Sequence, residues 1–492
     1  MAVASTVGKD SQASDAGHVF EPIWCEVVVV DSNGWMDPRS EMLLLSTDGN
    51  TKNLLVTAID IEGAVDEEAW VPAIRRASTC FPHLLSTVRE IKVNGLRRLL
   101  WEHRPDLRIP TTVWEVRDDG TAHGSLNDLL TPVAFHLDKE RDLFQEVPVD
   151  FHLIRRGPHR SMLIGMFHHV TADGATVAEF GKEFFAQYHE IKTGKRPEWA
   201  QETHAISSSA KRQARSVGAS SWRDALMGVR QTMANLFDKP TLPAGTGDPH
   251  DLGEHQIKRA LSEEETSLVL KRAASYGASP IDLFTACSKI AVDRWNEARG
   301  IAPGLLTCSV TVNARGRFGV SDQPNNSSVI FFRSEPEQRR ELKKLCRKLA
   351  VTRINHFRNH QDIKYMQDIE RMINSLRLLP FRMRRKIVHN VVNRHQFSIG
   401  VTLLGAVWPK MKNGKPSTET ALTNAADLSL REVHAIGYKL LSGNHAMLVA
   451  YTFRNRLNLV LAGSACRFTR KETEDFLDLI VKILVGDSPQ LR

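Results

Sequence analysis

The chain has 492 residues, of which 42% are hydrophobic and 25% are charged, and its formal net charge is +8. These are ordinary proportions for a globular protein, and no stretch approaches the roughly twenty apolar residues of a membrane-spanning helix. The length is too great for one hydrophobic core and suits two lobes of about 200 residues each.

The cysteines and the N-terminus limit the classes of protein to which this chain can belong. The six cysteines are scattered, without a CxxC pair or nearby histidine ligands. This spacing argues against a disulfide framework and against zinc, so we expect no metal. Residues 1–19 are small and polar and lack the apolar core of a signal peptide. We therefore expect a disordered N-terminus and a cytoplasmic protein.

Residues 20–195 show the alternation of strands and helices expected of a first lobe. Apolar runs bounded by turn residues predict the strands, and an acidic start predicts the helix. The predicted elements are strands at Phe20–Val30 and Leu54–Ile61, a helix at Asp66–Thr79, a hairpin around Asn94-Gly95, and a hairpin formed by Val147–Ile154 and Ser161–Phe167.

Residues 196–255 are rich in Ser, Ala, Gly and Pro, and we interpret them as an interlobe linker. Residues 256–492 then form the predicted C-terminal lobe. Its predicted elements are helices at Glu263–Tyr276 and from Ser279 onward, strands at Leu305–Val312, Val329–Arg333 and Phe397–Val407, a loop at Trp408–Ser429, a hairpin formed by His445–Tyr451 and Leu457–Leu461, and a last helix at Lys471–Leu484.

One stretch of the first lobe carries recognisable chemistry. The strand Ser161–Phe167 leads into the loop HHVTADG, residues 168–174, and a helix is predicted at Ala175–Tyr188. An imidazole can take and return a proton near neutral pH, so a histidine at the end of a buried strand is a candidate general base. Side chains alternate along a strand, so only one of His168 and His169 faces a given cleft.

The other residues of the loop suggest support for such a base. Asp173 is placed to hold the loop through a hydrogen bond or an arginine partner, and Gly174 permits a backbone that a Cβ would obstruct. The alternative is a core histidine followed by a turn and a helix cap. Because chance gives an HHxxxDG string in about one chain of this size in a thousand, we favour the functional interpretation.

This string resembles the HHxxxDG signature of the chloramphenicol acetyltransferase-like acyltransferase superfamily, which includes condensation domains, wax ester synthases and plant acyltransferases. The resemblance implies that His169 is the catalytic base and that His168, Asp173 and Gly174 support it, with Asp173 in a structural ion pair. It also implies an α/β (α+β) fold of two chloramphenicol acetyltransferase-like lobes, each a mixed sheet flanked by helices, with a tunnel between them.

A second segment resembles the same superfamily more loosely. The strand Leu305–Val312 ends in Asn313-Ala314-Arg315-Gly316-Arg317, and Pro324-Asn325-Asn326 precedes the next strand. The resemblance implies that Arg315 is the partner of Asp173 and that Asn325 or Asn326 binds substrate near the tunnel. A surface arginine and a plain turn are the alternatives.

The positive charge is concentrated in one predicted helical region. Between Arg339 and Arg394 there are sixteen Lys or Arg and four Asp or Glu, a surplus that exceeds the net charge of the whole chain. This region is either a solvated face or an attraction for coenzyme A, an acidic carrier protein or anionic lipid. No nucleic-acid-binding motif accompanies it, so we expect no nucleic acid partner.

The sequence therefore predicts an acyltransferase that transfers groups other than aminoacyl groups. The expected donor is a thioester of coenzyme A or of a carrier-protein phosphopantetheine, the acceptor is a small molecule with a hydroxyl or an amine, and no cofactor stays bound. An inactive condensation-like scaffold is one alternative. A peripheral membrane lipid O-acyltransferase, anchored by the basic amphipathic segment Leu376–Val392, is another.

The sequence leaves several properties open. It contains neither the DFGWG element of the plant branch nor the Pro-Leu-Trp element of the wax ester branch, so the branch is undefined. The acyl chain length, the kind of donor, the acceptor, the group that stabilises the oxyanion and the oligomeric state are also undefined, because pocket walls are built from residues scattered over both lobes.

Overall fold

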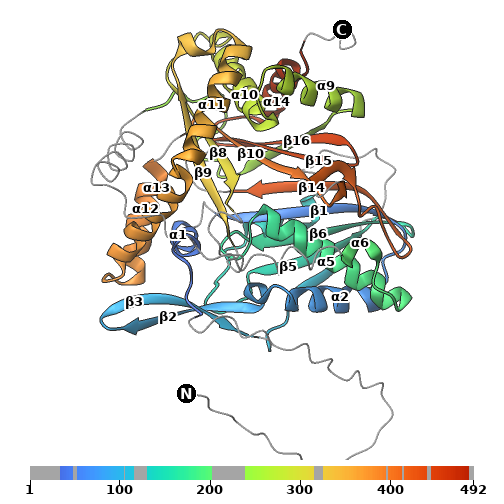
Figure 1. Ribbon diagram of the computed structural model, residues 1–492. Helices are drawn as coiled ribbons and strands as arrows, with labels where there is room; N and C mark the ends of the chain where they lie inside the picture. Colours follow the sequence, from blue (N-terminus) through green and yellow to red (C-terminus); the bar gives the residue numbers. More distant parts are fainter. Residues whose placement is uncertain are drawn as a thin grey trace, which may run out of the picture.

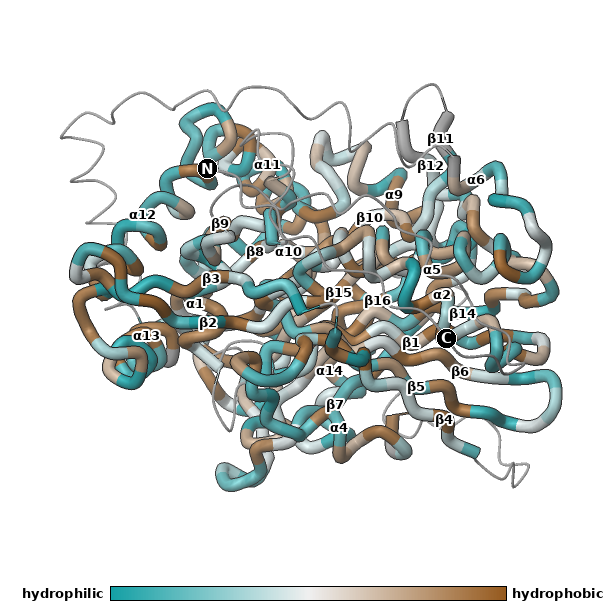
Figure 2. Tube along the Cα trace, turned by 90° about the horizontal axis from the view of Figure 1, so that it is seen from below, coloured by the Kyte–Doolittle hydropathy of each residue, from teal (hydrophilic) through white to brown (hydrophobic). Residues whose placement is uncertain are grey.

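The computed structural model describes residues 34–47, 52–104, 106–115, 130–201, 239–314, 325–394, 397–412, 415–439 and 445–486. The predicted N-terminal segment 1–19, the strand Phe20–Val30 and most of the linker 196–255 lie outside these residues. Figure 1 shows two sheets stacked along the long axis of the view, with helices on their outer sides. In Figure 2 the central strands are mostly hydrophobic and the peripheral helices carry the hydrophilic residues.

The first sheet has six strands and places the HHxxxDG loop at the end of a central strand. Only β4 (Thr111–Glu115) and β5 (Val149–Arg155) are parallel in it. Strand β6 (Arg160–His168), buried from Ser161 onward, pairs with β1 (Leu54–Glu62) and with β5. Helices α2 (Glu67–Thr79) and α5 (Gly174–Thr193) pack together against this sheet. The strand order is β13 (Asn424–Ala425), β14 (Leu428–Tyr438), β1 (Leu54–Glu62), β6 (Arg160–His168), β5 (Val149–Arg155) and β4 (Thr111–Glu115).

The second sheet also has six strands and is mixed, since β10 runs parallel to β8 and β15 while the other neighbours are antiparallel. Its order is β7 (Glu254–Ala260), β16 (Arg456–Ser464), β15 (Ala446–Phe453), β10 (Ile399–Ala406), β8 (Leu306–Asn313) and β9 (Ser327–Ser334). Helices α9 (Glu263–Ser275), α10 (Pro280–Glu297) and α14 (Arg470–Val485) cover it. The predicted α/β class, with sheets flanked by helices, is confirmed. The tunnel stays a prediction.

The segment Trp408–Ser429, expected to be a loop, instead contains strands. It forms the two-stranded sheet of β11 (Pro409–Lys412) and β12 (Lys415–Thr420), then β13 and the start of β14. The prediction of a loop was wrong because the segment is polar, although β11 pairs locally with β12 and β13 pairs locally with β14. β14 also pairs with β1, so residues from the predicted C-terminal lobe complete the first sheet.

The predicted hairpin at Asn94-Gly95 is confirmed as β2 (Ser86–Val93) and β3 (Leu96–His103). Both turn residues have positive φ, 51° at Asn94 and 82° at Gly95, as a two-residue hairpin turn requires. The hairpin projects beyond the first sheet toward α13 (Phe381–Arg394), as Figure 1 shows. At its tip the Arg97 backbone N–H donates to the Arg377 carbonyl at 2.8 Å.

The basic region forms three helices, α11 (Leu342–Arg358), α12 (Gln361–Leu376) and α13 (Phe381–Arg394). A helix that was not predicted, α1 (Pro38–Ser46), packs against α12 and α13. The Asp37 side chain caps α1 by accepting the N–H groups of Arg39 and Ser40. The chain thereby brings its N-terminal part onto the basic helices.

A buried ion cluster fixes α1 to α13 and to the β2–β3 hairpin. Glu41 of α1 pairs with Arg377 at 3.0 Å and also with Arg384, and Arg384 pairs in addition with Glu90 of β2. Glu41 and Arg384 are both fully buried. Burial raises the pKa of Glu41 above its ordinary value, although the two guanidinium groups oppose that shift. Three distant segments are therefore joined by a cluster whose centre, Glu41 and Arg384, is buried, while Glu90 at its edge is partly exposed.

The described residues contain neither a membrane-spanning helix nor a disulfide. No described helix combines the length and the apolar character that crossing a bilayer requires. Five cysteines, Cys80, Cys287, Cys308, Cys346 and Cys466, lie in the described part of the chain, and all five carry free thiols.

The ion cluster gives a stability prediction. Glu41→Ala leaves two guanidinium groups without their shared carboxylate, and breaking a buried pair in this way costs about 3–5 kcal/mol. The control is Glu102→Ala, which removes the exposed partner of Arg89 on the same hairpin and should cost about 0–1 kcal/mol. Urea denaturation should show a clearly lower midpoint for the first variant only, and equal midpoints would contradict the assigned role.

Candidate active site

Strand pairing fixes the backbone of the HHxxxDG loop. The His168 N–H donates to the Pro148 carbonyl at 2.8 Å, and the His169 N–H donates to the Asn53 carbonyl at 2.7 Å. Strand β6 ends at His168, and helix α5 begins at Gly174. The two histidines therefore lie at the junction between a strand and a helix, as predicted from the sequence.

The two histidines have different surroundings. His168 is 1% exposed, and its Nδ1 accepts the Val170 N–H at 3.2 Å. Burial, with the charge of Arg141, lowers the pKa of His168 to about 3, so this ring stays neutral. His169 is partly exposed. Of the two histidines, His169 is therefore the more accessible.

The hydrogen bonds of His169 define its tautomer. Its Nδ1 lies 2.8 Å from the Ala172 carbonyl, which can only accept, so Nδ1 carries the proton. The Asn325 amide nitrogen donates to the His169 carbonyl at 2.8 Å and lies 3.1 Å from Nδ1. The Asn325 oxygen faces the Ser327 hydroxyl at 3.2 Å, which sets the orientation of the amide. This assignment, made from the network, leaves the lone pair on Nε2.

The electrostatic surroundings keep His169 neutral. Burial is the main cause that lowers its pKa below the ordinary value of 6.5, and the positive charge of Arg39 acts in the same direction. Asp173 opposes these effects without reversing them. Arg39 is itself held beside the site, because its guanidinium donates to the Ser327 hydroxyl at 2.8 Å. A neutral ring with a free Nε2 is the state in which histidine accepts a proton.

Asp173 connects the two lobes. It is 2% exposed, and one carboxylate oxygen caps α5 by accepting the Thr176 N–H at 3.0 Å. The other oxygen accepts the backbone N–H of Asn326 at 3.0 Å. Asn326 directly precedes β9 of the second sheet. Arg315, its predicted partner, lies outside the described residues, so that ion pair stays a prediction.

Gly174 lies where the second sheet approaches the loop. A Cβ added to it would lie 2.6 Å from a terminal methyl carbon of Leu404 in β10. The constraint at Gly174 is thus space taken by the other lobe, and a positive φ is not involved. The predicted need for a residue without a Cβ agrees with this geometry, and the neighbour responsible was not foreseen.

Sequence reasoning missed the contribution of α1. The Ser40 hydroxyl donates to the Val170 carbonyl at 2.8 Å, next to His169 in the loop. Asn53, with a positive φ of 49°, donates its side-chain amide to the Leu43 carbonyl at the end of α1. The Asp37-Pro38 pair is a helix-start signal and would have predicted α1. It carries no information about the 130-residue separation between Ser40 and Val170.

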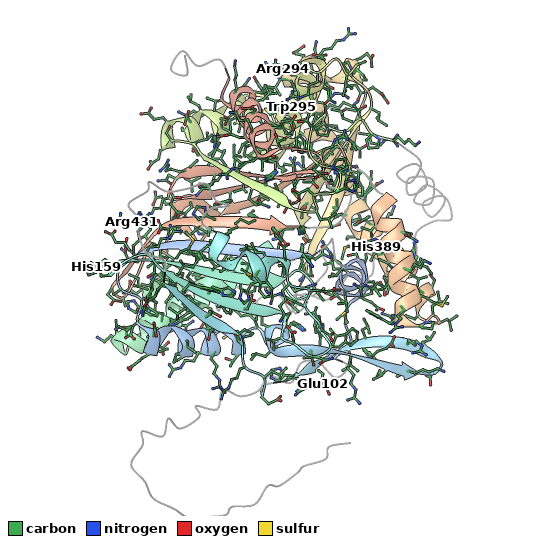
Figure 3. The ribbon with its side chains drawn as sticks, turned by 180° about the vertical axis from the view of Figure 1, so that it is seen from behind. Glu102, His159, Arg294, Trp295, His389 and Arg431 are labelled. Carbon is green, nitrogen blue, oxygen red and sulfur yellow. The ribbon has the colours of Figure 1, made fainter. Side chains whose placement is uncertain are left out.

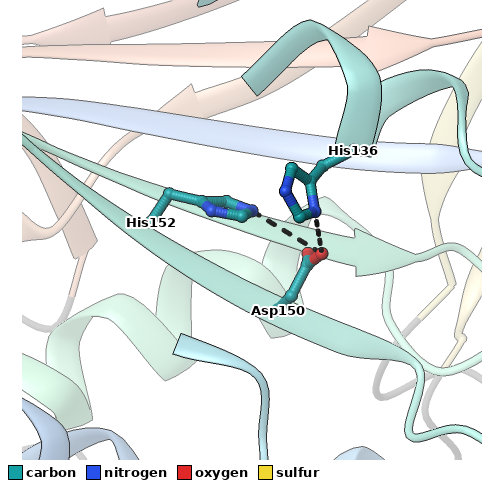
Figure 4. A group of neighbouring side chains, drawn as sticks. All are labelled: His136, Asp150 and His152. Atoms are coloured by element: carbon teal, nitrogen blue, oxygen red, sulfur yellow. Dashed lines mark ion pairs between the residues drawn. The ribbon is translucent and has the colours of Figure 1, made fainter. Parts of the chain in front are cut away.

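Another group of side chains has the composition of a metal site, although the sequence predicts none. Figure 4 shows His136 of α4 (Ala134–Asp138) beside Asp150 and His152 of β5, with ligand atoms within 4.8 Å of one another. Asp150 and His152 are two residues apart on one strand and so share a face. Whether these side chains can bind a cation depends on their other contacts.

Those contacts do not suit a cation. The Trp114 indole N–H, which can only donate, lies 3.2 Å from Nδ1 of His152, so the proton of the neutral ring is on Nε2, the atom that faces Asp150. Arg141 occupies the other side of Asp150 at 2.7 Å. Burial alone raises the pKa of Asp150, but His152 and Arg141 outweigh it and hold the pKa below its ordinary value. The group is an Arg141–Asp150 ion pair flanked by two histidines.

Part of the chain matches a known family of proteins. Residues 127–309, less than half of the sequence, match the family model described as Condensation domain, and they include the HHxxxDG loop. A search of curated protein sequences gives no match.

Solved structures share the fold at low sequence identity. The TRI3 trichothecene 15-O-acetyltransferase from Fusarium sporotrichioides is 13% identical, with a TM-score of 0.65 over 92% of this chain and 94% of that one. The first condensation domain of the calcium-dependent antibiotic synthetase, in complex with a substrate analogue, is 14% identical, with a TM-score of 0.60 over 92% and 96%. The epimerization domain from the third module of tyrocidine synthetase B is 13% identical, with a TM-score of 0.59 over 94% and 98%.

These likenesses at 13–14% identity show a common fold. Together with the matched residues, that fold confirms the resemblance of this chain to the condensation domains and acyltransferases of the chloramphenicol acetyltransferase-like superfamily.

Proposed function

We propose that the protein is an acyltransferase in which His169 is the general base. The observation that carries this proposal is the hydrogen-bond network of the ring, which leaves the lone pair on Nε2. The lowered pKa of His169 supports it, because a neutral imidazole accepts a proton at pH 7. The family match over the HHxxxDG loop supports acyl transfer as the class of reaction.

The proposed reaction needs no covalent enzyme intermediate. Nε2 of His169 takes the proton of the acceptor hydroxyl or amine as its oxygen or nitrogen attacks the carbonyl carbon of a thioester. The tetrahedral intermediate then expels the thiolate, which takes the proton from Nε2. The new bond is an ester or an amide, the broken bond is carbon to sulfur, and the base returns to its first state.

We place the reactants between the two lobes. The ring of His169 belongs to the first lobe, while Asn325 and Asn326, which contact His169 and Asp173, lead into the second sheet. A tunnel at this junction would let the thioester of coenzyme A or phosphopantetheine enter from one side and the acceptor from the other. Holding both reactants in line would supply much of the rate enhancement.

In this scheme Asn325 is a positioning residue. Its amide bridges the lobes and fixes the carbonyl of His169, which differs from the substrate-binding role expected from the sequence. Asn325 is fully buried, and its amide contacts the base itself.

His169→Ala should keep the fold and lose transfer by a factor of about a hundred to ten thousand, the usual cost of removing a general base. The control is His159→Ala, which changes an exposed histidine at the far end of the β5–β6 hairpin (Figure 3). Both variants should melt like the wild type. A His169→Ala protein that is active and folded would overturn the assignment.

The assay for turnover also tests the scaffold alternative. We expect release of free thiol from an acyl-coenzyme A, or from an acyl-phosphopantetheine thioester, to rise with acceptor concentration. Mass spectrometry of the products formed from a panel of acyl donors and acceptors identifies the substrates. Saturable binding of every thioester without thiol release would instead indicate a binding protein.

The pH profile tests the role of Asn325. The base must be unprotonated, so kcat/KM should fall on the acid side with an apparent pKa below the ordinary 6.5 of histidine. Asn325→Asp places a carboxylate next to Nδ1, which favours the imidazolium and raises the pKa of His169. Its acid limb should therefore move to higher pH. An unchanged limb would remove Asn325 from contact with the base.

Asp173→Ala should reduce stability and activity together. It removes a helix cap, worth about 0.5–2 kcal/mol, and one interlobe hydrogen bond. Thr469→Ala is the matched control, since it removes the cap of α14 without touching the loop. Both variants should melt at lower temperature, but only Asp173→Ala should lose activity while still folded. Full activity in folded Asp173→Ala protein would contradict a positioning role.

A further inference from the structure

Two segments far apart in sequence form one basic end of the molecule. They are the tip of the β2–β3 hairpin, residues 92–98, and the turn between α12 and α13 with the start of α13, residues 377–386, which we call the basic corner. The hydrogen bond from the Arg97 N–H to the Arg377 carbonyl joins them. Figures 1 and 2 both show the hairpin beside α13 at the same end of the molecule.

Large apolar side chains protrude from the basic corner. Leu378 is 70% exposed, Met383 is 52% exposed and Val93 is 38% exposed. Leu378 lies in the turn, Met383 lies on α13 and Val93 lies at the hairpin tip. Exposed apolar residues are common singly, but three of them on two hydrogen-bonded tips mark this end of the molecule as a candidate contact surface.

The basic corner itself carries charges of one sign, although two of its cations have acidic partners outside it, Arg97 with Glu90 and Arg385 with Glu140. Residues 92–98 and 377–386 contain no Asp or Glu. Arg377 and Arg384 are already paired with Glu41 inside the protein. Lys92, Arg382 and Lys386 are exposed, and within the described residues they have no carboxylate partner. These three cations are therefore available to an external anion.

We propose that the basic corner docks on an anionic lipid bilayer. Leu378, Met383 and Val93 would enter the boundary between headgroups and acyl chains, while the surrounding Lys and Arg side chains reach the headgroup phosphates. Apolar tips that project from a hairpin and a helix turn suit a deformable bilayer surface, whereas an acidic protein would offer the charge but no obvious place for the tips. Docking of this kind does not depend on the proposed catalysis.

The basic corner lies one helix away from the candidate active site. Arg384 of α13 pairs with Glu41 of α1, and the neighbouring Ser40 donates to the Val170 carbonyl beside His169. A bilayer bound at this end would therefore lie on the α1 side of the HHxxxDG loop. This last step rests on the proposed function and makes a membrane-borne donor or acceptor the matching class of substrate.

The test is co-sedimentation of the full chain with vesicles. Vesicles of phosphatidylcholine mixed with phosphatidylserine should pull the protein down, vesicles of phosphatidylcholine alone should not, and high salt should weaken the binding. The double variant Met383→Ser/Lys386→Glu should lower the affinity by about fivefold or more, since each lost basic contact near an anionic surface weakens it by that order.

Helix α9 offers a matched control. Leu268 is 50% exposed there, and the exposed Lys271 follows it at the same spacing as Lys386 follows Met383. Figures 1 and 2 show α9 far from α13, and Figure 3 places His389 of α13 on the opposite side of the molecule from His159. Leu268→Ser/Lys271→Glu makes the same change in charge and should bind vesicles like the wild type.

Three outcomes would overturn the docking proposal. They are the absence of binding to phosphatidylserine vesicles, an equal loss in both double variants, and binding of an acidic carrier protein at the basic corner in place of lipid. Thiol release from a water-soluble acyl-coenzyme A without vesicles should be the same in both double variants. Loss of docking and loss of catalysis are thus measured separately.

Discussion

The bridge that Asp173 makes between the lobes is the constraint on which the candidate site depends. One of its oxygens starts α5, and the other holds the backbone that precedes β9. Beside it, Asn325 fixes the carbonyl of His169 from the second lobe. The base is therefore oriented by groups from both halves of the molecule, and its geometry exists only when the halves are joined. A buried carboxylate suits this purpose because it accepts strong hydrogen bonds and tolerates little displacement.

On the other side of the HHxxxDG loop, helix α1 also connects two parts of the molecule. Helix α1 contacts the loop through Ser40 and the basic helices through Glu41, so neighbouring residues on one helix face two different environments. Removing charged groups from water costs free energy. The Glu41 cluster therefore stabilises the fold only if its opposite charges lie close together. The cluster joins α1, α13 and the hairpin in one arrangement. The position of the basic corner relative to His169 follows from that arrangement.

The sequence predicted the parts of this structure that are local. Strand β6, the HHxxxDG loop and α5 lie within about thirty residues, and their apolar spacing and turn residues identify them. Contacts between distant residues were not predictable. Asn325 and His169 are 156 residues apart, and only the packing of the lobes brings them together. β14 was missed because charged residues interrupt its alternation and because its partner β1 lies far upstream.

The place of β14 in the first sheet has a consequence for how the protein is made. Strand β1 is synthesised early, but one of its edges stays open until residues 428–438 have left the ribosome. The first lobe therefore cannot close as an independent unit during translation, and an unprotected edge persists while most of the chain is being made. Chaperones that shield exposed strand edges would act in this interval, and fragments divided between the sheets would find their native state only by reassociating with each other.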